Sequence, residues 1–251
     1  MEINCVKQFN LNICTLQLSE LVDAINQSIN YETKPLIISG VNAYAIVTSK
    51  KDTVYRDYLN NSDIINIDGF SIVIALRFLG YQIKERSSCP DLFHKLLELA
   101  ELKKYCVYFL GAQKFIVDKA AENLKKRYPA LKIVGIRSGY FNEDEENEIV
   151  TDILDKRPTM LFLGMSSPKK DAFAYKYSKK FNVPIILGVG GVFDIEAGTI
   201  KRSPIWFQKN GMEWLFRLIQ EPRRMWKRYL IGNIEFIYLV LIEKYRMKKY
   251  K

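Results

Sequence analysis

Short apolar runs recur along the chain, and polar or charged segments separate them. Five or six of these runs are rich in Ile, Val, Leu and Phe and only a few residues long, which is typical of strands buried on both faces. The stretches between them place apolar residues at helical spacing, as in residues 16–29. The runs that we predict to be strands are Pro35–Ile38, Ile64–Ile67, Val107–Leu110, Leu131–Ile136, Met160–Gly164 and the run that begins at Pro184.

The alternation of strands and helices predicts an α/β fold, with a mostly parallel, Rossmann-like sheet and helices on both of its faces. Because the carboxyl ends of parallel strands meet at one edge of a sheet, we expect the residues there to converge on one crevice. The chain has no GxGxxG fingerprint and no GxxxxGK[ST] loop, which disfavours nicotinamide, flavin and P-loop nucleotide chemistry. The glycine or polar residues at these strand ends are Asn42, Asp68, Gly111, Gly164 and Gly188.

The segment from Ile186 to Trp214 holds the densest group of candidate residues. Its strand leads into Gly188, Gly190 and Gly191, where the backbone can approach a ligand closely. A glycine-rich strand end beside charged side chains favours a ligand site, and the alternative is a strand–turn–helix connection with solvated charges. The charged residues that follow are Asp194, Glu196, Lys201 and Arg202.

Several polar residues near the strand ends have two interpretations. Asp68 is either a functional carboxylate or the N-cap of the next helix, and Asn42 has the same two roles open to it. We expect Asp91 to cap a helix over residues 92–102. His94 on that helix is interpreted as packed or exposed, because the sequence shows no carboxylate partner for it.

The charge of the chain is concentrated at its C-terminal end. Residues 201–251 contain 13 Lys and Arg against 4 Asp and Glu, whereas the preceding residues are nearly neutral. With one His and four Cys that lack metal-ligand spacing, no metal site is predicted. The N-terminus shows no export signal, which favours a cytosolic protein with reduced thiols.

The C-terminal segment has the pattern of a helix that lies in a membrane interface. Its apolar run, Leu230–Ile242, is interrupted by Glu235 and is shorter than the roughly 20 residues of a spanning helix. Cations at both ends and nearby aromatics favour an anionic membrane surface, and the alternative is a helix packed on the body or in a homo-oligomer. Nucleic acid would suit the charge but not the apolar run. We therefore expect an α/β domain over residues 1–214 and a helical, membrane-associating appendage over residues 215–251.

From about Asn42 to Tyr229 the chain resembles the WecG/TagA/CpsF family of bacterial glycosyltransferases. The segment from Gly188 to Tyr229, the Asp68-Gly69 turn, the Arg86–Asp91 loop and the Pro168-Lys169-Lys170 stretch after Gly164 are similar to the family's motifs. The resemblance implies an inverting transfer of N-acetylmannosamine, its uronic acid or glucose from a UDP-sugar. The implied acceptor is a sugar on undecaprenyl diphosphate, used for capsule, exopolysaccharide or teichoic acid synthesis at the cytoplasmic face of the membrane, and no metal or other cofactor is implied.

The resemblance also assigns roles to residues. Asp68 matches the family's proposed general base, which takes the proton of the acceptor hydroxyl. Arginines would stabilise the departing diphosphate where no metal does. The implied donor- or acceptor-binding residues are Asn42, Arg86, Asp91, Gly111, Gly164, Lys169, Lys170, Gly190, Gly191, Asp194 and Arg202. The implied diphosphate- or membrane-binding residues are Arg217, Arg223, Arg224 and Arg228.

One departure and two rival hypotheses stand beside this expectation. Lys170 occupies a position where many members have a neutral amide, so the donor sugar is left open. In the first rival hypothesis, Asp194 and Glu196 hold a metal ion for the diphosphate, as hard carboxylate ligands do. In the second, the chain is a membrane-associated binding protein without catalysis.

Overall fold

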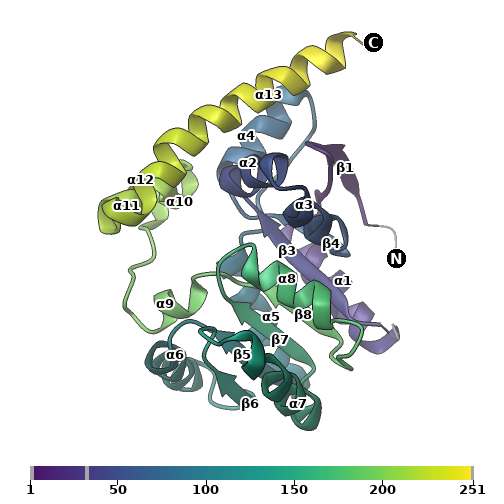
Figure 1. Ribbon diagram of the computed structural model, residues 1–251, viewed down its shortest axis with the longest axis vertical. Coiled ribbons are helices and arrows are strands. Elements are labelled where there is room, and N and C mark those ends of the chain that lie inside the picture. The colour runs from purple at the N-terminus through teal and green to yellow at the C-terminus, as the bar shows by residue number, and fades with distance from the viewer. Residues whose placement is uncertain (1–2, 32–33, 250–251) are drawn as a thin grey trace.

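One sheet organises the chain. In the computed structural model, which describes residues 3–31 and 34–249, eight strands pair in the order β1-β2-β4-β3-β8-β7-β5-β6 (Figure 1). All neighbouring pairs are parallel except β1 with β2, which confirms the predicted mostly parallel sheet. The strands are β1 (Cys5–Gln8), β2 (Leu11–Cys14), β3 (Leu36–Val41), β4 (Ile64–Ile67), β5 (Cys106–Gly111), β6 (Lys132–Arg137), β7 (Met160–Gly164) and β8 (Ile185–Gly188).

Helices cover both faces of the sheet. In β5, Val107 and Phe109 pack with α1, α5 and α6, whereas Tyr108 and Leu110 pack with α7 and α8 on the other side. This alternation explains why the strand reads as a continuous apolar run. The helices of the body are α1 (Leu18–Tyr31), α2 (Ala43–Lys51), α3 (Thr53–Asn60), α4 (Phe70–Leu79), α5 (Cys89–Lys103), α6 (Lys114–Arg127), η1 (Glu143–Glu145), α7 (Glu146–Lys156) and α8 (Lys169–Tyr177).

The hairpin of β1 and β2 was not among the predicted strands. Its turn residues, Phe9 and Asn10, both have positive φ, at 55° and 61°. Such a two-residue turn usually contains glycine, as in Asn-Gly, and this chain uses Phe-Asn instead. The usual hairpin signal is therefore missing from the sequence.

The start of α5 corrects one expected cap. The helix begins at Cys89, and the Ser88 hydroxyl accepts from the Asp91 backbone N–H. Asp91 consequently lies in the first turn, where its charge is favourable, and the expectation that it caps the helix is wrong.

Short helices at the C-terminal end lead into one long helix across the body. Phe236 and Val240 of α13 are buried with residues of α2 and α4, and Lys51 of α2 pairs with Glu235 at 2.6 Å. No helix of residues 3–31 and 34–249 is long and apolar enough to cross a bilayer. The elements are α9 (Val192–Glu196), α10 (Ile205–Lys209), α11 (Glu213–Gln220), α12 (Pro222–Trp226), the π-helical η2 (Lys227–Ile231) and α13 (Gly232–Lys249).

Candidate active site

A cleft of about 1720 Å³ lies between the carboxyl ends of the central strands and the C-terminal helices. It is larger than a typical small-molecule site of about 300–1,000 Å³, so it has room for two substrates together. Four of the predicted strand-end residues line it, one from each of β3, β4, β7 and β8 or the turn that follows: Asn42, Asp68, Gly164 and Gly188.

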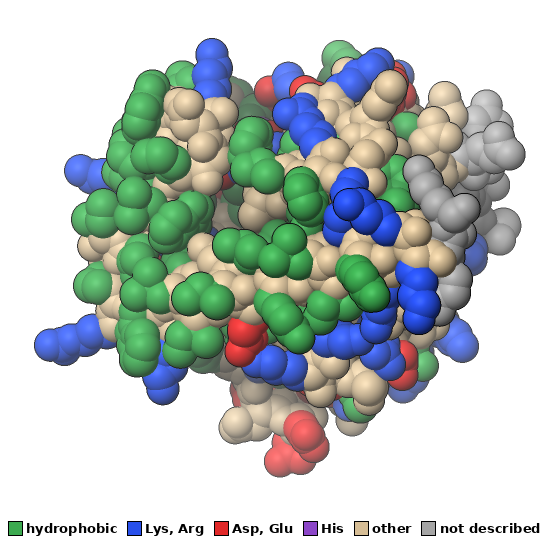
Figure 2. Space-filling model, turned by 90° about the horizontal axis from the view of Figure 1, so that it is seen from above, with side chains coloured by type: hydrophobic (Ala, Val, Ile, Leu, Met, Phe, Trp, Pro, Cys, Tyr) green, Lys and Arg blue, Asp and Glu red, His purple; other side chains and the backbone are tan. Residues whose placement is uncertain are grey.

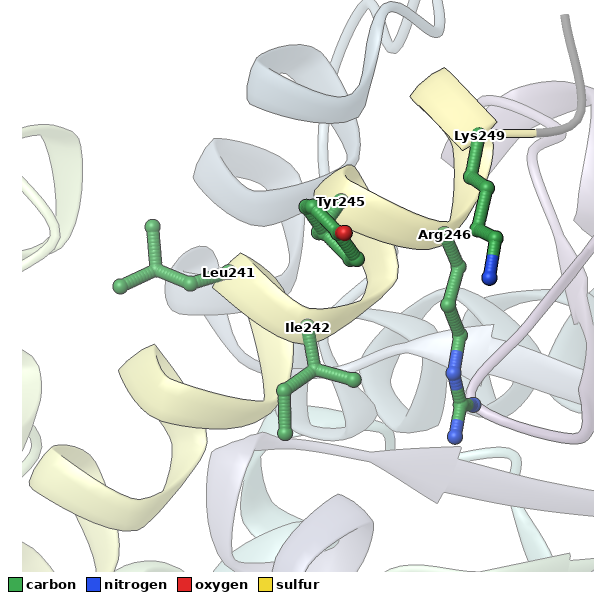
Figure 3. Close-up of a pocket in the computed structure, with 5 residues that line it drawn as sticks. All are labelled: Leu241, Ile242, Tyr245, Arg246 and Lys249. Carbon is green, nitrogen blue, oxygen red and sulfur yellow. The ribbon is translucent and has the colours of Figure 1, made fainter.

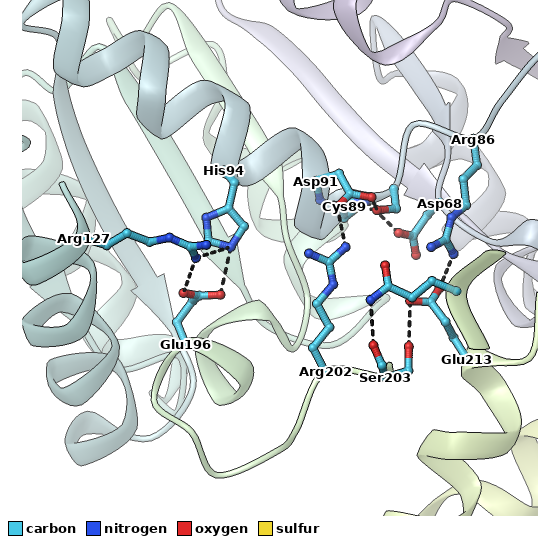
Figure 4. A network of polar contacts seen from close by, with 12 residues as sticks. Asp68, Arg86, Cys89, Asp91, His94, Arg127, Glu196, Arg202, Ser203 and Glu213 are labelled. Carbon is cyan, nitrogen blue, oxygen red and sulfur yellow. Dashed lines mark hydrogen bonds and ion pairs between the residues drawn. The ribbon is translucent and has the colours of Figure 1, made fainter. Parts of the chain in front are cut away.

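The Asp68 carboxylate lines the cleft and is held through both of its oxygens. Its Oδ1 accepts from the Cys89 backbone N–H at 2.8 Å (Figure 4), and Asn42 Nδ2 donates to its Oδ2 at 3.5 Å. The N-cap of α4 is Gly69, with no side-chain cap bond, so Asp68 is not the helix cap. Asn42 does cap a helix: it is the N-cap of α2, and its Oδ1 accepts from the Ala45 backbone N–H at 3.1 Å. The same side chain therefore serves both the helix and Asp68.

A buried thiol, that of Cys89, lies against Asp68, and no sequence pattern predicts it there. A side chain at Gly40 would collide with Cys89 Sγ, so this glycine makes the space that the thiol occupies. Burial, and then the negative charge of Asp68, raise the pKa of the Cys89 thiol well above its ordinary value. The thiol therefore stays protonated at neutral pH and presents an S–H beside the carboxylate.

Lys170 and Asp171 form a buried ion pair under the cleft. Lys170 Nζ donates to Asp171 Oδ1 at 2.5 Å, and the Ser39 hydroxyl donates to the same oxygen at 3.1 Å. Burial works to lower the pKa of Lys170, but the charge of Asp171 holds it above its ordinary value. The charge of Lys170 is thus neutralised from within the fold.

The candidate glycines serve different purposes. A side chain at Gly111 would collide with the Gly164 backbone, and one at Gly164 would collide with the Phe193 ring, so packing accounts for both. Of these two, only Gly164 lines the cleft. Gly190 has a φ of +57°, and a Cβ at Gly191 would lie 2.8 Å from Arg217 Nη2. The missing side chain of Gly191 therefore admits a guanidinium into the cleft.

Two ion pairs tie the C-terminal segments to the body. Arg86 pairs with Glu213 of α11, and Arg202 pairs with Asp91 of α5 (Figure 4). Burial works to raise the pKa of Asp91, but Arg202 and Ser88 hold it below its ordinary value. Asp91 is not among the residues that line the cleft, so its place is behind Arg202.

Arginines of the C-terminal helices form one wall. Arg217 and Arg224 share Glu221, at 3.6 Å and 2.8 Å. Burial raises the pKa of the nearby Asp194, against the charges of Arg224 and Arg217. The guanidinium carbon of Arg228 lies 4.6 Å from the centroid of the Tyr44 ring. Three of the four candidate arginines of these helices line the cleft, and Arg223 is not among the lining residues.

Several guanidinium nitrogens have hydrogen-bonding capacity left. Nε of Arg202, Arg217 and Arg228 is buried without an acceptor in the described part of the chain. Lys169, in contrast, is engaged at the rim, because its Nζ donates to the backbone carbonyls of Gly139 and Phe141 at 3.0 and 3.1 Å. The guanidinium groups of Arg202, Arg217 and Arg228 line the cleft, and such cations are suited to bind an anionic ligand.

His94 has the carboxylate partner that the sequence did not reveal. Its Nε2 lies 3.0 Å from Glu196 Oε1, and Arg127 approaches the same carboxylate (Figure 4). Glu196 is thereby engaged with α5 and α6, whereas Asp194 lines the cleft. The two carboxylates of the rival metal hypothesis do not converge, and the described residues contain no group of three or more His, Cys, Asp or Glu side chains with metal-site geometry.

A second hollow, of about 460 Å³, lies along α13 (Figure 3). All of its lining residues belong to this one helix, so it is a shallow flank and not a cleft between elements. It also lacks the strand ends and carboxylates of the large cleft, and we assign no site to it. Its lining residues are Leu241, Ile242, Tyr245, Arg246 and Lys249.

The chain is similar to one family of known proteins over nearly its whole length. The model of the glycosyl transferase WecG/TagA/CpsF family matches residues 6–250. The N-acetylglucosaminyldiphosphoundecaprenol N-acetyl-beta-D-mannosaminyltransferase of Bacillus subtilis (strain 168) is 29% identical over 240 residues, which cover 96% of this chain and 92% of the relative. The enzymes of the same name from Bacillus spizizenii and Staphylococcus aureus (strain MW2) are 29% and 28% identical, over 88% of this chain and 84% and 86% of their own lengths.

Proposed function

Because this chain belongs to the WecG/TagA/CpsF family of glycosyltransferases, we propose that it transfers a sugar from a UDP-sugar to a sugar on undecaprenyl diphosphate. The reaction would proceed with inversion and supply a cell-surface polysaccharide such as capsule, exopolysaccharide or teichoic acid. The relatives are named for the transfer of N-acetylmannosamine to an N-acetylglucosaminyl acceptor. A cleft with room for both substrates supports this proposal.

The observation that carries the proposal is the setting of Asp68. Inversion requires one base that takes the proton of the acceptor hydroxyl as its oxygen attacks C1 of the donor sugar. Asp68 lies at the carboxyl end of β4, lines the cleft, and is oriented by the Cys89 N–H and by Asn42. These hydrogen bonds fix the position of the carboxylate in the cleft, where a general base has to lie within reach of the acceptor hydroxyl.

The arginines that line the cleft suit the leaving group. As the bond from C1 to the diphosphate breaks, negative charge grows on the phosphate oxygens. Arg217, at the Gly191 turn, and Arg202 both line the cleft. We propose that such arginines bind the diphosphate in place of a metal ion.

We also propose that the protein acts at the cytoplasmic face of the membrane. Large apolar side chains remain exposed along the C-terminal helices, and Figure 2 shows them gathered on one face with Lys and Arg among them. A lipid-linked acceptor is reached from such a position. We name these residues the membrane face: Ile205, Trp206, Ile219, Trp226, Leu230, Ile234, Tyr238 and Tyr245.

The test is a transfer assay with a panel of UDP-sugars and lipid-linked acceptors, read by mass spectrometry of the product. Asp68→Asn keeps the shape of the side chain and removes the base, so we expect transfer to fall by about 10²–10⁴ while UDP binding persists. The matched control is Asp57→Asn, an exposed carboxylate of α3 that does not line the cleft.

Other outcomes would favour the rival hypotheses. Near-wild-type transfer by Asp68→Asn would remove Asp68 from the chemistry. The absence of any product with every donor and acceptor, with lipid binding intact, would favour a binding protein. Because Lys170 is neutralised by Asp171, we expect the preferred donor to carry no charge on its sugar, such as an N-acetylhexosamine.

A further inference from the structure

The cleft continues beyond its polar residues into an apolar groove. Helix α4 starts directly after the Asp68-Gly69 turn, and one side of it lines the cleft along its whole length. Ser71 comes first, then Ile74 and Ala75, and then Phe78. At about 1.5 Å per residue, Phe78 lies roughly 15 Å from Asp68 along the helix axis.

Helix α13 forms the other wall of this groove. Ile237 and Leu241, one turn apart, line the cleft beside the buried Val240. Lys244 holds the two helices together, because its Nζ donates to the Phe78 carbonyl at 2.7 Å. Ile74, Phe78, Ile237 and Leu241 are each between 50% and 59% exposed, so two facing apolar ridges are open to solvent.

Cations line the cleft at the start of α13, at the opposite end of this helix from Lys244, which contacts Phe78. Arg228, stacked on Tyr44, and Lys227 line the cleft and belong to η2, the segment that leads into α13. Arg228 Nε has no acceptor in the described residues. Along the cleft, the chemistry therefore changes from carboxylate to cation to apolar surface.

This order matches the order of groups along a polyprenyl-diphosphate sugar: a hydroxyl, a diphosphate and a branched hydrocarbon. We infer that the groove between α4 and α13 binds the first isoprene units of the acceptor lipid, next to the diphosphate. The inference rests on the proposed function and adds to it a lipid subsite within the protein. The groove residues Ile74 and Phe78 belong to the body, so this subsite differs from the membrane face of the C-terminal helices.

Continuity argues for lipid over a protein partner. The groove is part of the same cleft as Asp68, so its occupant is joined to whatever binds at the base. Each buried CH₂ group contributes about a fourfold gain in affinity, so the burial of even one or two isoprene units would raise the affinity for the lipid strongly.

A binding measurement tests this on the full-length protein. Farnesyl diphosphate, kept below its micelle concentration, is compared with inorganic diphosphate. We expect farnesyl diphosphate to bind at least tenfold more tightly. Ile74→Ser/Phe78→Ser should abolish most of this preference and leave the affinity for inorganic diphosphate unchanged. Both side chains are half-exposed, so the variant is expected to fold.

The matched control is Leu102→Ser/Phe115→Ser, which exchanges exposed apolar side chains of α5 and α6 outside the cleft and should keep the preference. Equal affinities for the two ligands, or a preference that survives in the groove variant, would overturn the inference. Loss of self-association in the groove variant, with the preference intact, would instead assign the groove to a second copy of the chain. Absence of sugar transfer would reject the proposed function alone, because the farnesyl preference is measured without turnover.

Discussion

Two oppositely charged side chains are buried against each other under the cleft. The side chains of Lys170 and Asp171 are only 8% and 1% exposed. Lys170→Met would leave Asp171 buried without its cation, which costs about 3–5 kcal/mol of unfolding free energy. Lys170→Met/Asp171→Leu should regain most of that loss. Urea unfolding measures both, and equal stability of the single variant and the wild type would contradict the pairing.

Buried thiols should make stability depend on alkaline pH. Burial raises the pKa of Cys14 to about 11, and burial with the Asp68 charge raises that of Cys89. In the unfolded chain both titrate near pH 8.5. The folded pKa values are raised, so their contribution is complete below about pH 8.5 and is lost as pH rises towards the folded values.

We therefore expect the unfolding free energy to fall by up to about 1.4 kcal/mol per pH unit for each thiol between roughly pH 8.5 and 10. Denaturant unfolding across this range measures the slope. Cys14→Ala/Cys89→Ala should give a flatter profile, whatever its stability at neutral pH. An identical slope in this variant would assign the pH dependence to other groups.

At the same scale, the strand ends made Asn42 and Asp68 predictable, because they follow apolar runs directly. Their partners were not predictable. Cys89 reaches Asp68 across 21 positions and Glu196 reaches His94 across 102, and no local pattern encodes such contacts. Glycine is likewise required at positions 40 and 191 because a Cβ there would meet Cys89 and Arg217, and only the packed structure shows these contacts.

The elements show the same division between local and distant information. The six strands β3–β8 were predicted because strands buried on both faces are continuously apolar. The β1–β2 hairpin was missed because its turn lacks glycine. The stretch before Asn60 forms two helices, α2 and α3, because Asp52 caps α3 by accepting from the Tyr55 N–H. How α13 packs on α2 and α4 depends on contacts between segments that are far apart in the sequence.

The C-terminal helices have a consequence for metal dependence. They bring Arg217, Arg224 and Arg228 to the cleft, while Glu196 is engaged by His94. We expect turnover to survive excess EDTA, because guanidinium groups supply the charge that a metal ion would. Activity lost to EDTA and restored by Mg²⁺ or Mn²⁺ would favour the rival metal hypothesis.

Arg217→Lys should lower kcat, since Lys lacks the bidentate fork.

For the whole molecule, we expect the membrane face to bind anionic vesicles. Each nearby Lys or Arg contributes about 1 kcal/mol, and added salt should weaken binding by screening. Removing the chain after Gln220 would uncover core, because Phe236 and Val240 are buried, so point variants are the better test. Ile234→Ser/Tyr238→Ser should reduce co-sedimentation with vesicles at least tenfold. Unchanged co-sedimentation would mean that the apolar face meets a protein instead.

Neighbouring turns of α13 belong to two surfaces: Ile237 and Leu241 line the groove, while Ile234 and Tyr238 lie on the membrane face. In such an arrangement one substrate reaches the cleft by diffusion in three dimensions and the other by diffusion in two. Under the proposed function, the nucleotide-sugar diffuses to the cleft through solution, whereas the lipid-linked sugar diffuses laterally within the membrane. For the acceptor, the quantity that sets the rate is then the number of molecules per unit area, so diluting it with inert lipid slows transfer even when its amount in the tube is constant.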